Sequence, residues 1–390
     1  MRLLNDLDLR GKRVFIRVDF NVPLKNGVVS DASRIEAAMR TVRYAMQHDA
    51  KVILASHLGR PKGKVDPAYS LEPVRKILTT ILGKAVALAP DCVGPETEAL
   101  VDALQPGDVL LLENLRFHAE EEKNDEAFSR ALARLADVYI NDAFGTAHRA
   151  HASTVGMVPF VAAHAAGFLL QRECEYLSKI LQSPPRPVVA ILGGAKVSDK
   201  IKVIRSLLSR VDTLLIGGAM AYTFLRAQGI ATGKSLVEAE HVPLATSLLA
   251  EAEKRGVSLL LPIDHVVAPD TKSPGAAKTV REIPADQVAL DIGPMTVERF
   301  RAAITKARTI FWNGPLGMFE VPPFDAGTVA IAGAVADADA TSVIGGGDSV
   351  AAVIRSGRAD DISHISTGGG ASLEFVEGEP LPGLAALGAA

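Results

Sequence analysis

The stretch PVVAILGGAKVSDK, residues 187–200, decides the fold expected for this chain of 390 residues. Its first six residues form an apolar run rich in β-branched side chains, which is typical of a buried strand. Gly193 and Gly194 follow the run, and a segment with helical spacing follows the glycines. This order of strand, turn and helix is the repeating unit of an α/β fold with a mainly parallel sheet.

The same unit recurs through the second half of the chain, where further apolar runs also lead into turns that contain glycine. The runs occupy residues 213–216, 309–312, 341–344 and 362–365, and they lead into Gly217-Gly218, Asn313-Gly314-Pro315, Gly345-Gly346-Gly347-Asp348 and Thr367-Gly368-Gly369-Gly370. Glycine lets backbone N–H groups approach a phosphate closely, and the N-terminus of a following helix adds the positive end of its dipole. The second half therefore predicts a nucleotide site.

In the first half, the apolar runs end in polar residues instead. The runs occupy residues 14–18, 51–55, 109–112 and 138–140, and they continue as Asp19-Phe20-Asn21, Ser56-His57-Leu58-Gly59-Arg60, Glu113-Asn114-Leu115-Arg116 and Asn141-Asp142. The carboxyl ends of parallel strands meet at one crevice, so we expect these residues to lie close together. Arg34, Arg60, Arg116 and Arg149 are cations of this half, and the guanidinium fork matches phosphate and carboxylate. The first half predicts a site for a small, multiply charged anion.

Phosphoryl transfer needs positioning and charge stabilisation more than covalent chemistry. Lys196 and Lys200 are four residues apart at a predicted helix start, so both ammonium groups are expected to project from one face. Asp348 is a candidate Mg²⁺ contact, because Mg²⁺ needs only one or two carboxylates when phosphates supply other ligands. Glu320 is a candidate acceptor for ribose hydroxyls.

Each of these features has a simpler interpretation when it stands alone. An isolated arginine is usually a solvated surface charge, and a Gly-Gly pair is usually a turn. The Gly-Lys-Ser sequence at 233–235 is not a P-loop, because Gln228 occupies the position of its first glycine. Val350 likewise replaces the third glycine of a dinucleotide fingerprint. A nicotinamide-dependent dehydrogenase and a non-catalytic anion-binding protein remain as alternatives, and titration with ADP or NAD distinguishes them.

Composition narrows the class of protein further. A chain of 390 residues predicts two domains, and 48% hydrophobic with 22% charged residues is a globular composition. The net charge of -3 argues against nucleic acid or an anionic membrane as a partner. The start of the chain does not resemble a signal peptide, so we expect a cytoplasmic protein. Cys92 and Cys174 give no disulfide framework or zinc spacing, and we expect inert thiols.

A series of ordered segments lies between Arg17 and Gly383. The segments are Arg17-Val18-Asp19-Phe20-Asn21-Val22-Pro23, Ser56-His57-Leu58-Gly59-Arg60-Pro61, Glu113-Asn114-Leu115-Arg116-Phe117, Asn141-Asp142-Ala143-Phe144-Gly145, Ala147-His148-Arg149-Ala150-His151, residues 192–200, Trp312-Asn313-Gly314-Pro315, residues 345–349 and residues 366–372. Together these segments resemble the phosphoglycerate kinase family. Two positions depart from the usual pattern: Met295 stands where lysine is expected, and His265 where an apolar residue is usual.

The resemblance implies an enzyme that transfers a phosphoryl group reversibly between 1,3-bisphosphoglycerate with ADP and 3-phosphoglycerate with ATP. It implies a Mg²⁺-dependent, direct in-line transfer after hinge closure, in glycolysis and gluconeogenesis, by a cytoplasmic monomer. The implied catalytic residues are Arg34, Lys196, Lys200, Gly369 and Gly370. The implied 3-phosphoglycerate site consists of Asp19, Phe20, Asn21, Arg34, His57, Leu58, Gly59, Arg60, Arg116 and Arg149. The implied nucleotide site consists of Gly194, Ala195, Lys200, Gly218, Asn313, Pro315, Glu320, Gly346, Gly347, Asp348 and Ser349, with Asp348 also at the metal.

The pattern and the resemblance together predict two Rossmann-like lobes, each a mainly parallel sheet flanked by helices, joined by a hinge. We expect a 3-phosphoglycerate-binding domain at residues 1–168 and a connecting helix and hinge at 169–185. A nucleotide-binding domain at 186–366 and a segment at 367–390 that returns to the first domain complete the expected order. The prolines within residues 183–187 support the boundary, because proline disfavours both helix interiors and central strands.

Overall fold

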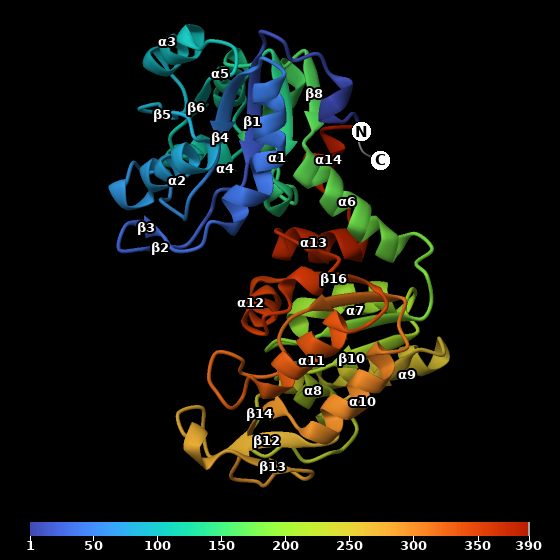
Figure 1. The fold of residues 1–390 in the computed structure, drawn as a ribbon. Helices are drawn as coiled ribbons and strands as arrows, with labels where there is room; N and C mark the ends of the chain where they lie inside the picture. Colours follow the sequence, from blue (N-terminus) through green and yellow to red (C-terminus); the bar gives the residue numbers. More distant parts are fainter. Residues whose placement is uncertain (389–390) are drawn as a thin grey trace. The chain divides into compact units, whose positions relative to one another are not determined.

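The computed structural model describes residues 1–388, which divide into two compact units. Unit 1 consists of Met1–Glu175 and the described residues from Pro380 onward, and unit 2 is Tyr176–Glu379. Each unit contains one large parallel sheet with helices against it (Figure 1). The predicted α/β class with two mainly parallel sheets is therefore confirmed.

The sheet of unit 1 has the order β5-β6-β4-β1-β7-β8, and all neighbouring strands in it are parallel. Its strands are β1 (Arg13–Val18), β4 (Lys51–Ala55), β5 (Ala87–Leu88), β6 (Val109–Leu111), β7 (Val138–Asp142) and β8 (Ala163–Ala166), and a separate hairpin joins β2 (Leu24–Lys25) to β3 (Val28–Val29). The helices are α1 (Ser33–Gln47), α2 (Glu72–Leu82), α3 (Pro95–Ala103), α4 (Ala119–Glu122), α5 (Glu126–Arg134), α14 (Pro382–Ala385) and the start of α6 (Phe168–Leu181). The four expected strands are present, whereas β5 and β8 were not predicted because they are short and rich in alanine.

The sheet of unit 2 has the order β11-β10-β9-β15-β16-β17, again with parallel neighbours. Its strands are β9 (Val188–Leu192), β10 (Thr213–Ile216), β11 (Ser258–Leu260), β15 (Thr309–Asn313), β16 (Thr341–Gly345) and β17 (His364–Ile365). A smaller antiparallel sheet, which the sequence did not predict, consists of β12 (His265–Ala268), β13 (Lys278–Val280) and β14 (Val288–Ile292). The helices are α7 (Ile201–Leu208), α8 (Met220–Ala227), α9 (Val242–Lys254), α10 (Pro294–Ile304), α11 (Ala326–Ala336), α12 (Gly347–Arg355) and α13 (Gly369–Glu377).

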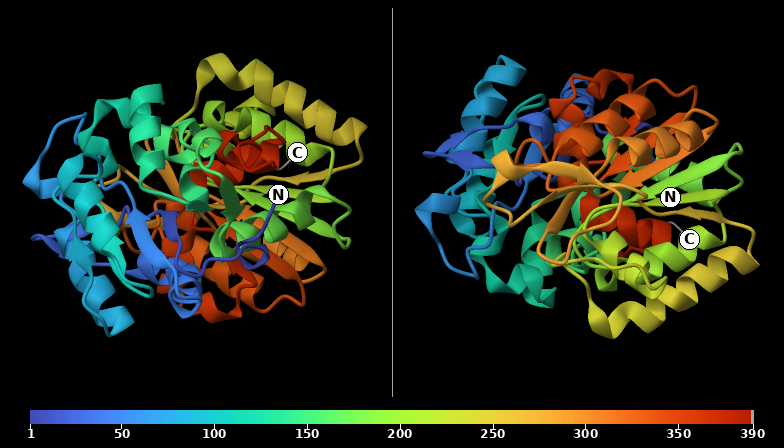
Figure 2. Two further views of the ribbon diagram at one scale, coloured as in Figure 1. Left: turned by 90° about the horizontal axis from the view of Figure 1, so that it is seen from above. Right: turned by 90° about the horizontal axis from the view of Figure 1, so that it is seen from below.

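Helices cover both faces of the large sheet of unit 2. Helix α7 packs against α9 and α13, and α11 packs against α10 and α12. Figure 2 shows α9 on one side of the strands and α10 with α11 on the other. Strands β9 and β15 are buried along their whole length, as expected for central parallel strands that are covered on both faces.

The pleat of β1 decides which side chains of unit 1 reach the candidate site. Val14, Ile16 and Val18 belong to the core cluster that includes α1 and α2. Because side chains alternate along a strand, Phe15 and Arg17 point to the opposite face. The hydrogen bond from Arg17 to Ser153, in a segment between β7 and β8, shows that this second face is also covered.

The chain changes unit at two places. The first lies within α6, between Glu175 and Tyr176, and the second lies between Glu379 and Pro380. The sequence predicted that the segment returning to the first domain begins at residue 367 and spans 367–390. Helix α13, however, packs against α7 and remains in unit 2. After Pro380 the chain lies in unit 1, where Gly383 N donates to Ala147 O at 2.8 Å.

Among residues 1–388, no helix combines the length and the apolar character that crossing a membrane requires.

The returning residues should stabilise unit 1. Leu384 is only 6% exposed and lies in α14, which packs against the π-helical turn η5 (Ala152–Gly156). Leu384→Ala should lower the free energy of unfolding by about 2 kcal/mol, because it leaves a cavity. Leu100→Ala, at a site that is 37% exposed on α3, is the matched control and should cost under about 1 kcal/mol. Urea unfolding followed by circular dichroism measures both, and an unchanged midpoint for Leu384→Ala would contradict the expectation.

Candidate functional site

Asp19 and Asn21 follow the end of β1 and are held by two other segments of unit 1. Arg34, in the first turn of α1, donates from Nη1 to Asp19 Oδ2 at 3.1 Å and to the carbonyl of Asn21 at 3.3 Å. The side-chain oxygen of Asn21 accepts a hydrogen bond from Gly59 N at 2.9 Å. The structure thus brings together residues that the sequence placed after β1, after β4 and in the following helix.

His57 lies among positively charged side chains. Its imidazole Nδ1 lies 3.3 Å from Arg17 Nη2. Burial lowers the pKa of His57 well below its usual value, and the charges of Arg17, Arg116, Arg149 and Arg34 lower it further. An imidazole in this position is neutral near pH 7. Four guanidinium groups therefore act on one buried ring, and this part of unit 1 is strongly positive.

Arg116 has a donor that no protein group satisfies. Its side chain is buried, Nη1 donates to the carbonyl of Gly59 at 2.9 Å, and Nε lies 3.2 Å from Glu122 Oε1. Both Nε and Nη2 are buried without a hydrogen-bond partner among residues 1–388, and Nη2 also lacks an ion-pair contact there. Burial also lowers the pKa of Arg116, yet an arginine remains charged at any physiological pH. A buried, unpaired donor is costly, and an anionic ligand would satisfy it.

The other predicted residues of unit 1 contribute less through their side chains. Arg149 is half-buried and its Nε lies 3.2 Å from His148 Nε2, whereas Arg60 is exposed. The side chains of Phe20 and Leu58 belong to the hydrophobic core. Only the backbones of Phe20 and Leu58 are therefore available to a ligand.

Sequence reasoning missed a buried polar network beneath the arginines. Arg17 is fully buried and donates from Nε to Ser153 Oγ at 2.8 Å, and Ser153 Oγ donates to Glu121 Oε1 at 2.5 Å. Burial raises the pKa of Glu121, while Arg17 opposes that shift. One indication of this network was present in the sequence, because Arg17 is the only charged residue in the apolar run 14–18. Its partners could not be identified, because they are distant in the chain.

In unit 2, the loops that follow β9, β10 and β15 are joined by backbone hydrogen bonds. Gly193 N donates to Asn313 O at 3.0 Å, and Gly194 N donates to Pro315 O at 3.0 Å. Gly218 N donates to a carbonyl of the same loop, that of Leu316, at 2.9 Å. A Cβ atom on Gly193 would collide with the carbonyl oxygen of Pro315, so the close approach of these loops requires glycine.

Lys200 lies in the turn η7 (Ser198–Lys200), directly before α7. Its ammonium group donates to Asn313 Oδ1 at 2.5 Å. Burial lowers the pKa of Lys200 to about 8, although the carboxylates of Asp199 and Asp348 act in the opposite direction. The side-chain nitrogen of Asn313 is buried and without a hydrogen-bond partner among the described residues. A cation and an unpaired amide donor thus lie side by side.

Lys196 does not share a helix face with Lys200, which corrects the sequence-based expectation. Helical structure begins only at Ser198, and Lys196 lies in the preceding loop with an exposed side chain. The carboxylate of Glu238 accounts for this geometry, because it accepts hydrogen bonds from Val197 N at 2.6 Å and from Ser198 N at 3.1 Å. These bonds hold the loop in place before the helix starts.

Two helix N-termini meet in unit 2. Helix α12 begins at Gly347 and α13 begins at Gly369. A Cβ atom on Gly369 would lie 3.1 Å from the Cα atom of Gly346, so the two starts are in close contact. The first backbone N–H groups of an α-helix lack partners within the helix, and they suit phosphate oxygens. Gly370 adds a further exposed position in the first turn of α13.

The remaining residues predicted to bind the nucleotide differ in the exposure of their side chains. Asp348 and Glu320 have exposed side chains, Ala195 is exposed, and Pro315 is half-buried. Ser349 is fully buried, and its hydroxyl accepts a hydrogen bond from Gly314 N at 2.6 Å. Ser349 therefore fixes the loop after β15 with its side chain and leaves only its backbone for a ligand.

The fold and these two groups of residues are those of a phosphotransferase of the two-unit α/β class. Unit 1 brings together buried and exposed arginines, and unit 2 brings together a lysine, close glycine loops and two helix N-termini.

Comparison with known proteins identifies the family. The phosphoglycerate kinase family model matches residues 4–379. The phosphoglycerate kinases of Solibacter usitatus (strain Ellin6076) and Moorella thermoacetica are each 59% identical to this chain, with 98% of both chains covered. The structure of phosphoglycerate kinase from Coxiella burnetii superposes with a TM-score of 0.89 at 40% identity, covering 99% of this chain and 98% of that one. The Pyrococcus horikoshii OT3 enzyme gives a TM-score of 0.88 at 36% identity, covering 100% of this chain and 98% of its own.

The chain belongs to the phosphoglycerate kinase family. It is a phosphotransferase, and its activity is the phosphoryl transfer of glycolysis that characterises this family. The family and the enzyme class predicted from the sequence are therefore confirmed.

The shifted pKa of Lys200 is directly measurable. The ¹³C resonance of its Cε atom, assigned with Lys200→Arg, should titrate with a pKa of about 8 in the folded protein. In urea it should return to the ordinary lysine value of about 10.4. Because the folded pKa is the lower one, the unfolded chain binds more protons between these values, and unit 2 should gain stability as pH rises through this window. Equal pKa values in the folded and unfolded protein would contradict the burial of this cation.

Proposed function

We propose that unit 1 binds 3-phosphoglycerate or 1,3-bisphosphoglycerate and that unit 2 binds ATP or ADP. The observation that carries this proposal is the buried, unpaired Nη2 of Arg116 among the arginines that act on His57. These groups suit a ligand with both a carboxylate and a phosphate, because each guanidinium presents parallel donors to a planar or tetrahedral anion.

In unit 1, Arg34, Arg60, Arg116, Arg149 and His57 would hold the anionic groups of the substrate. Asp19 and Asn21 carry oxygen acceptors suited to its hydroxyl group. Arg34 is partly exposed and pairs with Asp19 at 3.1 Å, so it has donors left for the transferred phosphoryl group. Phe20, Leu58 and Gly59 would contribute backbone atoms only.

In unit 2, Lys200 would stabilise the migrating phosphoryl group, and Lys196 would assist from the preceding loop. Asn313 holds the ammonium group of Lys200 through a neutral oxygen, so the positive charge is positioned without being neutralised. The N–H groups of Gly369 and Gly370 would donate to the same phosphoryl oxygens. Transfer would be direct and in line, with charge stabilisation as the main contribution of the protein.

The nucleotide would lie along the glycine loops of unit 2. Gly218, Asn313, Pro315 and Glu320 are proposed to contact adenosine. The phosphate groups would meet the backbone at Gly194, Ala195, Gly346, Gly347, Asp348 and Ser349.

The residues of unit 2 fit a Mg²⁺ ion at Asp348. Its carboxylate is exposed in the first turn of α12 and acts electrostatically on Lys200, which supports a role for it beside the proposed phosphates. A single carboxylate is enough when phosphate oxygens and water supply the other ligands. When bound, Mg²⁺ supplies positive charge that offsets the charge of the phosphate oxygens.

Because the two groups of residues belong to different units, transfer requires the bound substrates to be brought together. We propose that hinge closure does this and also excludes water, which would otherwise hydrolyse the acyl phosphate. A monomer is consistent with this scheme, since every proposed contact comes from one chain, and we propose that it acts in the cytoplasm.

A coupled assay with ATP, Mg²⁺ and 3-phosphoglycerate tests the proposal. ADP should appear only when all three are present, and omission of any one should abolish turnover. ADP formation that does not depend on 3-phosphoglycerate would overturn the assignment of unit 1.

Lys200→Ala should lower turnover by about a hundredfold or more, because the charge that stabilises the transition state is lost. The affinity for ADP should change little, since the other phosphate donors are backbone groups. Lys202→Ala is the matched control, because Lys202 is exposed on α7 and lies 3.5 Å from Glu379. Steady-state kinetics and ADP titration check both variants, and normal turnover in Lys200→Ala would remove this lysine from its role.

A further inference from the structure

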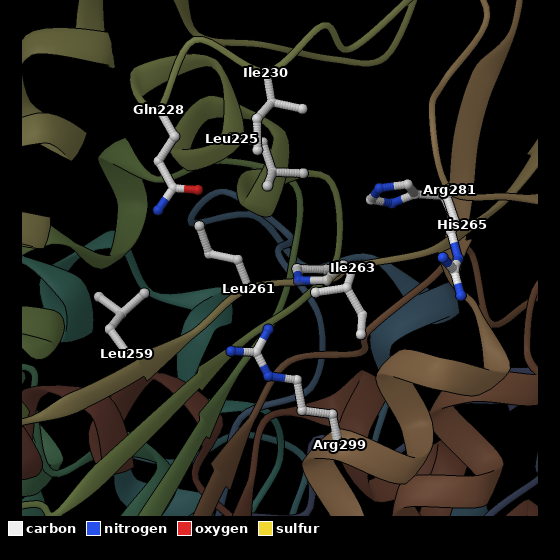
Figure 3. A pocket seen from close by; sticks show the side chains of 10 residues that line it. Leu225, Gln228, Ile230, Leu259, Leu261, Ile263, His265, Arg281 and Arg299 are labelled. Atoms are coloured by element: carbon white, nitrogen blue, oxygen red, sulfur yellow. The ribbon is translucent and has the colours of Figure 1, made fainter.

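Unit 2 contains a pocket with a volume of about 400 Å³ whose lining residues differ from all those proposed above (Figure 3). It is built where the end of α8, the segment after β11, the start of β12 and the side of α10 come together. Its volume lies at the lower end of the range for small-molecule sites. The pocket therefore suits a compact ligand rather than a nucleotide.

The walls of the pocket are apolar and partly open to solvent. Leu225 and Leu261 line it and are buried. Ile230 and Ile263 also line it, and they are 44% and 39% exposed. A flat apolar body placed between these side chains would remove their surfaces from water.

The polar lining is cationic and lacks carboxylates. Arg281 and Arg299 both line the pocket, and neither forms an ion pair with a carboxylate among residues 1–388. The Nη2 atom of Arg281 lies 3.3 Å from the sulfur of Met295. By contrast Arg301, two residues along α10 from Arg299, lies 3.7 Å from Glu298. Two guanidinium groups at an apolar pocket thus have donors to spare.

His265 supplies a neutral ring to the same pocket. It is buried, and its Nδ1 lies 3.5 Å from the hydroxyl of Tyr222. Burial lowers the pKa of His265 to about 4, so the ring adds no charge near neutral pH. Figure 3 shows His265 and Arg281 together on one side of the pocket, and Arg299 extends from α10 on another. The two guanidinium groups therefore lie on different sides of the pocket, and the aliphatic side chains lie between them.

We propose that this pocket binds a small aromatic carboxylate. Its ring would pack against Leu225, Leu261, Ile230 and Ile263. Its carboxylate would accept hydrogen bonds from Arg281, and the charge of Arg299 on the other side of the pocket would add electrostatic attraction. A planar carboxylate matches the donor fork of arginine, and a rigid ring loses little conformational entropy on binding. This inference does not depend on the proposed function, because none of these residues takes part in it.

The full-length protein tests the proposal with two matched probes. Indole-3-acetate carries the ring and the charge, and indole-3-acetamide carries the same ring without the charge. A ligand of this size is expected to bind with a dissociation constant on the order of 1 mM. The amide should bind about tenfold more weakly or worse, because it carries no negative charge to pair with the arginines. Isothermal titration measures both affinities.

Variants of the two arginines test whether indole-3-acetate binds in this pocket. The double variant Arg281→Ala/Arg299→Ala should weaken indole-3-acetate binding about tenfold or more. Both residues are exposed, so the fold should be unaffected. Arg301→Ala, on the same helix outside the pocket, should bind like the unaltered protein. Equal affinity for acid and amide, equal affinity in the double variant, or no binding of indole-3-acetate at about 10 mM would each overturn the proposal.

Discussion

The organisation of this protein depends on positive charge that is buried without enough negative charge to match it. In unit 1, Arg17 is satisfied by Ser153 and lies beside the network of Glu121, but Arg116 keeps a buried donor with no partner. Removing a charge from water costs several kcal/mol, and an unpaired buried donor adds to that cost. The packing of the rest of unit 1 has to offset this cost. A bound anion would remove it.

Unit 2 also holds a partly buried positive charge that is only partly compensated. Lys200 is held by the amide oxygen of Asn313 rather than by a carboxylate, and its lowered pKa measures the incomplete compensation. The loops around it are fixed by backbone hydrogen bonds and by Glu238, so the lysine and the helix N-termini are positioned in advance. Preorganised donors of this kind stabilise developing charge without reorganisation during the reaction.

Local patterns in the sequence were enough to predict the strands and the polar or glycine-rich residues that follow them. Alternation, β-branched runs and glycine act within a few residues, and the parallel arrangement then places strand ends together. What the sequence did not reveal depends on distant partners. Arg17 needed Ser153 and Glu121, and the geometry of Lys196 depended on the carboxylate of Glu238. The small sheet of β12, β13 and β14 was also missed, because its strands are short and partly exposed. The ligand contacts of the individual site residues stay predictions.

Hydrogen exchange with one substrate at a time tests the central claim most directly, that two separate groups of donors each hold one ligand. Added alone, 3-phosphoglycerate should slow amide exchange around residues 19–21, 57–60 and 116 of unit 1. ADP with Mg²⁺ should instead slow exchange around residues 193–200 and 345–349 of unit 2. Protection of the unit 2 loops by 3-phosphoglycerate alone, or of the unit 1 arginine segments by ADP alone, would contradict the account.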